Sequence, residues 1–103
     1  MPYIIVFSWY PPDIVNEVVK VYLEGLQKQP VPSYIKRLVP AAGASGKDGF
    51  ESINVDEVKL EDLGKAMDYI ARFMAIFVNI KGFRYRTRVF STVSEGLDQL
   101  GIS

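Results

Sequence analysis

Apolar and polar residues alternate most regularly over residues 83–90. In an extended strand this alternation places Arg84, Arg86 and Arg88 on one face and the apolar and aromatic residues between them on the other. One face is suited to a protein core, whereas the other carries a row of positive charge. The pattern therefore predicts a strand with one buried and one cationic face.

Three other runs of residues predict strands. Residues 3–10 are β-branched or aromatic at most positions and apolar on both faces, which is typical of a strand in the middle of a sheet. Residues 34–39 and 50–55 are shorter runs of the same kind. The glycine-rich segment between them, residues 41–49, is expected to be a mobile hairpin loop with a turn at Lys47-Asp48-Gly49.

Apolar residues at helical spacing predict two longer helices and a short one. The first follows Pro12 and is expected to end near residues 27–29, and the second runs from Leu60 to Gly82. Thr92 and Glu95 form a capping box that predicts a short terminal helix. The second helix carries a broad apolar stripe: Leu63, Met67, Ile70, Met74, Phe77 and Val78, widened by Phe73, Ile76 and Ile80. We expect its last turns to be buried against a partner or the terminal helix, because one small sheet covers too little of that stripe.

The predicted order is β-α-β-β-α-β followed by a short helix, and residues 1–103 are enough for one domain. This is the order of an α+β ferredoxin-like sandwich, in which two helices cover one face of a four-stranded antiparallel sheet. The other face would expose Tyr3, Ile5, Phe7 and Trp9. Because so large an apolar patch is usually covered by a second copy, we expect a homodimer joined through its sheet faces.

Composition excludes several classes of chemistry. Twelve basic and twelve acidic residues cancel, so no net charge attracts the protein to nucleic acid or anionic lipid. The absence of cysteine excludes thiolate catalysis and cysteine-ligated metals, and the absence of histidine excludes an imidazole base and histidine-ligated haem or iron. We therefore expect neither a metal site nor a cofactor. The remaining acid–base candidates are Glu51, Asp56, Tyr10 and Tyr34, and no spacing pairs any two of them.

No segment has the character of a membrane span or a leader. Residues 1–7 lack a basic flank, and their apolar run is shorter than the core of a signal peptide. The longest later run, residues 73–78, falls far short of the ~20 residues that cross a bilayer. The expectation is a cytoplasmic protein without membrane or nucleic-acid partners.

The chain resembles the dimeric α/β-barrel group of ferredoxin-like proteins, and within it a set of small uncharacterised microbial proteins. The resemblance rests on the strand of residues 3–9, the turn at 47–49, the strand start at 82–85 and the closing segment 92–97. It implies two sheets that pack face to face around a cavity. Enzymes of this group often use a histidine or bind haem, and a chain without histidine does not inherit those roles.

The arginine row has three interpretations. At a sheet edge, long cations deter aggregation between edges. Alternatively, the row binds an anionic or carboxylate ligand, or forms salt bridges with Glu51, Asp56 or a partner subunit. Neighbouring arginines lie ~7 Å apart along a strand and repel weakly in water. If a second sheet encloses the row, the three arginines need anionic partners, because they lose contact with water.

Aromatic residues are the second part of the candidate site. Tyr3, Phe7 and Trp9, together with Phe50 and Tyr34, are able to line a cavity between two sheets, beside the arginines. Such a cavity suits a planar or amphipathic acid. The alternative is that these side chains only pack the dimer core.

Two motif resemblances fail on inspection. Residues 41–49 contain glycines and a lysine, but a Walker loop requires glycine where Ala41 stands and Ser or Thr where Asp48 stands. Residues 81–90 are superficially similar to the RNP1 signature of RNA-recognition domains. That signature belongs on the strand before the second helix, whereas this segment follows it.

Two functions remain open from the sequence. The first is a non-catalytic module that binds a small anionic or aromatic ligand or serves as an assembly unit. The second is a cofactor-free enzyme of the dimeric α/β-barrel type that acts on an aromatic or carboxylic small molecule. In either case the predicted ligand-binding residues are Arg84, Arg86, Arg88, Trp9, Tyr3 and Phe7.

Overall fold

The computed structural model describes residues 1–101, which form four strands and three α-helices. In chain order the elements are β1 (Tyr3–Tyr10), α1 (Val15–Lys28), β2 (Ile35–Gly46), β3 (Gly49–Val58), α2 (Leu63–Met74), β4 (Arg84–Phe90) and α3 (Val93–Gln99). Short 3-10 turns precede α1 and flank α2: η1 (Pro12–Ile14), η2 (Leu60–Asp62) and η3 (Ala75–Phe77). The predicted succession of strands and helices is thus present.

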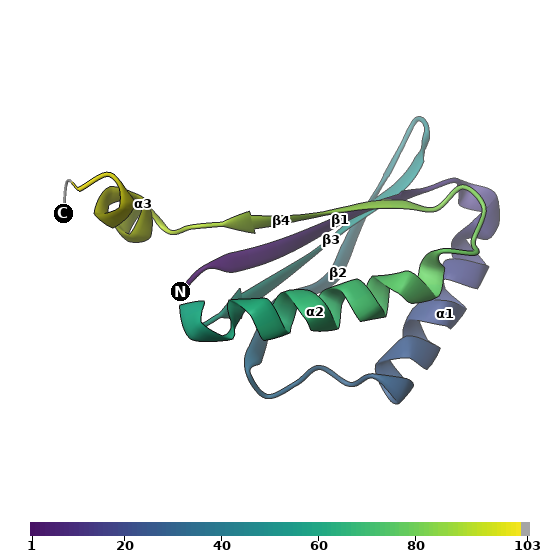
Figure 1. The fold of residues 1–103 in the computed structure, drawn as a ribbon. Helices are drawn as coiled ribbons and strands as arrows, with labels where there is room; N and C mark the ends of the chain where they lie inside the picture. Colours follow the sequence, from purple (N-terminus) through teal and green to yellow (C-terminus); the bar gives the residue numbers. More distant parts are fainter. Residues whose placement is uncertain (102–103) are drawn as a thin grey trace.

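All the strand pairs are antiparallel, and the four strands lie in the order β2-β3-β1-β4. β1 is an interior strand, as its apolar sequence predicts, and β4 lies at an edge. The face of β4 that was predicted to be buried is not, because Tyr85 and Val89 on this edge strand are 45% and 41% exposed. Figure 1 shows α1 and α2 on the same side of the sheet. We call that side the covered face and the opposite side the open face.

The hairpin formed by β2 and β3 is longer than predicted. Residues 41–46 were expected to form a loop, but Ala42 to Gly46 pair with β3 up to a turn at Lys47-Asp48. Glycine and alanine give little sign of strand structure in a sequence, yet their backbone groups bond in a ladder like any others. The turn itself is confirmed, and the tip of the hairpin projects beyond the rest of the sheet (Figure 1).

A β-bulge interrupts this hairpin between Val39 and Ala42. Pro40 has no backbone N–H, and the N–H of Ala41 donates to Oδ1 of Asn54 at 2.8 Å. Ala41 adopts a left-handed conformation with φ of 52°, which a bulge commonly requires. The bulge therefore fixes the side-chain amide of Asn54.

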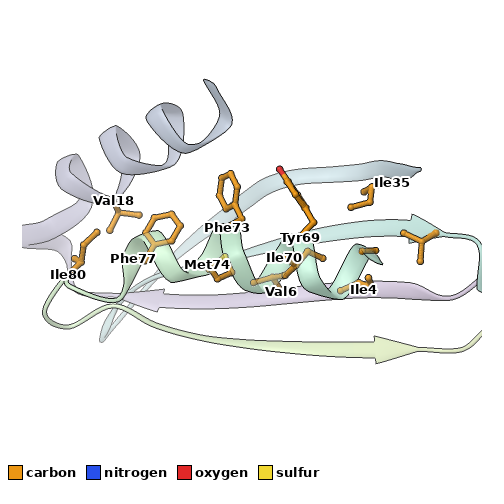
Figure 2. Packing of buried hydrophobic residues seen from close by; sticks show 12 residues of the cluster. Ile4, Val6, Val18, Ile35, Tyr69, Ile70, Phe73, Met74, Phe77 and Ile80 are labelled. Atoms are coloured by element: carbon orange, nitrogen blue, oxygen red, sulfur yellow. The ribbon is translucent and has the colours of Figure 1, made fainter. Parts of the chain in front are cut away.

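The core lies between α2 and the covered face. Ile4 and Val6 of β1 meet Tyr69, Ile70 and Phe73 of α2, as Figure 2 shows. Even-numbered positions of β1 are the more buried up to Ser8, while its odd-numbered positions point to the open face. The alternation of burial along β1 follows from the two-residue period of a strand.

The apolar end of the second helix is buried within its own chain, not against a partner or the terminal helix. Phe73, Phe77 and Ile80 belong to the core, and the Phe77 ring stacks on that of Phe83 at 4.6 Å between centroids. Val78, placed in the buried stripe by its helical spacing, is 77% exposed. The reason is that α2 ends at Met74 and the chain tightens into η3, which rotates Val78 outward.

α1 contacts α2 closely near its C-terminal end. A Cβ on Gly25 would meet Cδ1 of Ile76 and lie 3.1 Å from Cζ of Phe73, so a larger residue here would force these side chains to shift. The hydroxyl of Tyr69 donates to the carbonyl of Gln29 at 2.7 Å. These two contacts fix the end of α1 against α2.

We expect Tyr69→Phe to lower the free energy of unfolding by about 1 kcal/mol, because it removes this hydrogen bond and keeps the ring. Burial raises the pKa of Tyr69 above its ordinary value of 10.0. The stability contributed by its neutral form is therefore full below pH 10 and is lost as pH rises through the raised pKa. Urea denaturation at pH 7 and at about pH 11 measures both effects. An equal loss at the two pH values would contradict this account.

The capping box of α3 is present. Glu95 N–H donates to Oγ1 of Thr92 at 3.1 Å, and Thr92 N–H donates to Oε1 of Glu95 at 2.8 Å. The bond from the Thr92 backbone lowers the pKa of the Glu95 carboxyl, aided by the N-terminal ammonium of Met1 at 3.3 Å. α3 has no buried residue and lies beyond the end of β4, away from α2 (Figure 1).

Within residues 1–101, no helix combines the length and the apolar character needed to cross a membrane.

Candidate functional site

Strand register brings all six predicted site residues onto the open face. Trp9 pairs with Arg84, Phe7 with Arg86, and Tyr3 with Phe90. Arg88 pairs with Ile5 in the same way. The three arginines therefore form the β4 margin of the open face, directly beside the aromatic residues of β1.

The same register extends the open face across β3 and β2. We call each row of residues that pair directly across the four strands a rung. Read from β2 to β4, the rungs of the open face are Ala44-Glu51-Trp9-Arg84, Ala42-Ile53-Phe7-Arg86, Val39-Val55-Ile5-Arg88 and Lys36-Glu57-Tyr3-Phe90. The centre is apolar, and the β2 margin consists of small residues except for Lys36. The two carboxylates of the face, those of Glu51 and Glu57, lie at opposite ends of β3.

The arginine side chains are exposed. The guanidinium of Arg88 lies over the ring of Phe90, 4.9 Å from its centroid. Among the ion pairs found in residues 1–101, none includes Arg84, Arg86 or Arg88. The row therefore lies at a sheet edge, as the first interpretation expects, while a ligand or a partner subunit for the arginines stays a prediction.

The aromatic residues of β1 are half-buried and ordered side by side. The rings of Phe7 and Trp9 stack, with centroids 6.3 Å apart and an angle of 13° between their planes. Ile53, their neighbour on β3, is also exposed. These side chains form a continuous apolar surface across the middle of the sheet.

An open groove of about 680 Å³ lies at the hairpin end of the sheet, lined from the open face and from the adjoining loops. Trp9, Glu51 and Arg84 line it together with the turn that carries Lys47 and Asp48. The groove therefore contains two of the predicted residues, Trp9 and Arg84, and both signs of charge. Tyr3, Phe7, Arg86 and Arg88 lie outside it, farther along the sheet.

Of the two other aromatic residues proposed for this cavity, Phe50 lines the groove and Tyr34 does not. Phe50 pairs with Tyr10 and stacks on its ring at 6.0 Å, which places it on the covered face. Tyr34 packs against the core, and Nζ of Lys65 lies 4.9 Å above its ring. Strand pairing decides the position of Phe50, since residues that pair directly across two strands share a face. Tyr34 was expected to begin a strand but lies in the turn before β2.

Asp56 is a structural residue, neither an acid–base group nor a partner of the arginine row. Its side chain is 1% exposed and accepts two bonds from Arg37, at 2.8 Å from Nε and 2.9 Å from Nη2. Burial disfavours the charge on Arg37, but the hydrogen bonds and charge of Asp56 raise the pKa of the guanidinium overall. Arg37 has no signature in the sequence, because a lone cation gives no sign of its partner.

A second cavity, of about 160 Å³, lies between the helices and the covered face. It contains none of the six predicted residues. Its signals in the sequence were weak: the polar Ser8 at an inward position of β1, and the small residues Ala41 and Gly43 that fail to fill the space beside it. In residues 1–101 no group of three or more acidic side chains is placed to hold a metal ion.

Comparison with known proteins bears on the fold alone. No family model and no curated protein matches the sequence. The de novo designed protein Foldit4 is similar over 88% of this chain and 96% of its own, with a TM-score of 0.51 and 10% identity. An unknown protein from Galdieria sulphuraria matches 89% of this chain and 46% of its own length, with a TM-score of 0.47 and 15% identity. A DUF3240 family protein from Shewanella baltica covers 89% of this chain and 90% of its own, with a TM-score of 0.41 and 7% identity.

Proposed function

We propose that the protein is a small ferredoxin-like module of the dimeric α/β-barrel type, which self-associates through its open face and holds a small anionic or aromatic ligand beside the arginines. The strand order β2-β3-β1-β4 and the two helices on one face support the grouping. The observation that carries the proposal is the open face itself. It joins an apolar centre to a cationic margin on β4 and carboxylates on β3.

Repulsion between the arginine rows favours one of two possible orientations of two sheets that pack face to face. A two-fold axis in the interface and perpendicular to the strands would stack the arginines of one copy on those of the other, which is repulsive. An axis parallel to the strands instead places the β4 margin of one copy over the β2 margin of the other. There Arg84 lies over Ala44 and near Glu51 of the second copy, in a register set by the rungs. The small side chains of β2 leave room for the arginine stems.

The size of the open face is sufficient for a weak dimer. Four strands and four rungs cover roughly 20 × 20 Å at standard strand spacings. Two such faces bury on the order of 1,000 Å² in total, the lower range of specific interfaces. We therefore propose a dimer of micromolar affinity, in which the interface is apolar at its centre and charged at its margins.

Enclosure would turn the arginine row into a ligand site. Between two sheets the arginines lose water, so they require more negative charge than Glu51 and Glu57 supply on each face. A small anion with an aromatic body suits the groove that Trp9 and Arg84 line. This role is non-catalytic, because the ligand is held by charge and stacking alone.

We expect light scattering at about 100 μM protein to give twice the 11.6 kDa mass of one chain. Dilution toward low micromolar concentration should shift the mass toward that of the monomer. A mass of one chain throughout this range would refute the sheet-face dimer.

A charge exchange tests the orientation of the two copies. Arg84→Glu should weaken the dimer about tenfold, because it places a carboxylate near Glu51 of the second copy. Adding Glu51→Arg should restore most of the affinity. Arg72→Glu, a matched change at an exposed position on α2, should have little effect. A tighter dimer for Arg84→Glu alone would instead indicate that the arginine rows face each other.

A further inference from the structure

We infer that the cavity between the helices and the covered face is a binding site for a small neutral aromatic compound with one hydrogen-bond acceptor, of the size of an aromatic amide. Its volume is about 160 Å³. For comparison, an apolar protein cavity of about 150 Å³ accommodates benzene. The inference goes beyond the proposed dimer, since every residue of this cavity comes from one chain and none of the three arginines takes part.

The walls of the cavity are fixed, so the space does not close by a small movement of α1. At its C-terminal end the helix is in contact with α2 through Gly25 and through the bond from Tyr69 to Gln29. Near its other end Val18 is buried in the core (Figure 2). Between these points Val19 lines the cavity and remains 47% exposed. α1 is therefore held at Val18 and near its C-terminal end, while the neighbouring Val19 lacks full cover.

Aromatic and aliphatic side chains on one side of the cavity determine which ligand ring fits there. Ile70, Phe73, Met74 and Phe77 line the cavity from the helix side, and Val6 from the sheet. These side chains offer dispersion contact and no hydrogen bonds, except for the weak acceptor of the methionine sulfur. A planar ring is the fragment that best fills such a space.

Hydrogen-bond donors of the side chains that line the cavity determine the polar group of the ligand. Asn54 uses Oδ1 to accept from Ala41, which leaves its Nδ2 group as a donor. Arg37, which also lines the cavity, binds Asp56 through Nε and Nη2, so its Nη1 group remains as a second donor. Because Asp56 already balances the charge of Arg37, the wall is close to neutral. A buried carboxylate would lose its hydration without gaining a net positive charge, so a neutral carbonyl is favoured.

The test compares benzamide with benzoate by ¹H–¹⁵N chemical shifts of the complete protein. We expect benzamide to shift amide signals of cavity residues such as Ser8, Asn54 and Phe73, with saturation near millimolar concentration. Benzoate should bind these residues at least tenfold more weakly. Equal binding of both compounds, shifts confined to Trp9 and Arg84, or no shift at all would overturn the inference. Absence of benzamide binding would not contradict the proposed dimer, because the dimer is tested separately by its mass in light scattering.

Two variants fill the cavity and one controls for them. Gly43→Leu projects toward the cavity, and its Cβ meets only ordinary contact, 3.6 Å from the carbonyl of Glu51. Ser52→Leu adds similar volume from β3. Each should weaken benzamide at least tenfold, whereas Ala71→Leu, at an exposed position of α2 that does not line the cavity, should not change it. Unchanged binding in both filled variants would place the ligand elsewhere.

Discussion

Replacement of Arg37 by methionine should lower the free energy of unfolding by about 3–5 kcal/mol. The side chain of Asp56 is 1% exposed and receives both of its described bonds from Arg37, whose own side chain is 16% exposed. Without the guanidinium, a carboxylate remains buried among apolar residues with neither a counter-charge nor those two donors. Urea denaturation at pH 7 measures the loss, and an unchanged m value would show that unfolding remains a single transition.

Two further variants separate the ion pair from the volume of the side chain. The double variant Arg37→Met/Asp56→Leu should recover most of the lost stability, because it removes the buried charge together with its partner. Arg72→Met makes the same replacement at an exposed site and should change stability by less than about 0.5 kcal/mol. A loss below about 1 kcal/mol for Arg37→Met would mean that water reaches Asp56 freely.

The strands and the terminal cap could be predicted from the sequence because their signals are local. The apolar run of β1, the alternation in β4 and the capping box of Thr92 and Glu95 each depend on residues close in the chain. The pairing of residues 42–46 with β3 could not be predicted from the sequence. It depends on backbone hydrogen bonds to a strand whose length is set by the whole sheet. The outward position of Val78 likewise depends on where α2 tightens into η3.

The candidate site was predictable only in part. Alternation placed the arginines on one face of their strand, and separately placed Tyr3, Phe7 and Trp9 on one face of theirs. Whether the two faces coincide depends on the register between β1 and β4, which no local pattern encodes. The same limit applies to Phe50, whose pairing with Tyr10 places it on the covered face. The inner cavity was missed because it arises where α1 and the sheet fail to meet.

We expect Phe7→Asp to convert the proposed dimer into a monomer, with a dissociation constant raised at least 100-fold. Phe7 lies on the second of four rungs, between Ile53 and Arg86, at the centre of the open face. A face-to-face dimer would bury the new carboxylate in the apolar middle of the interface, where central residues contribute most of the affinity. Light scattering across a dilution series measures the change.

The fold should tolerate this substitution, because residue 7 points away from the core and the new carboxylate pairs across the strands with Arg86. Circular dichroism and urea denaturation would establish that the monomer is folded. Val78→Asp is the matched control, since Val78 is 77% exposed and lies outside the open face. It should leave the dimer intact. If Phe7→Asp remained dimeric while folded, association would have to use another surface. The exposed apolar residues of α3 and its C-cap would be the next to test: Val93, Leu97 and Leu100.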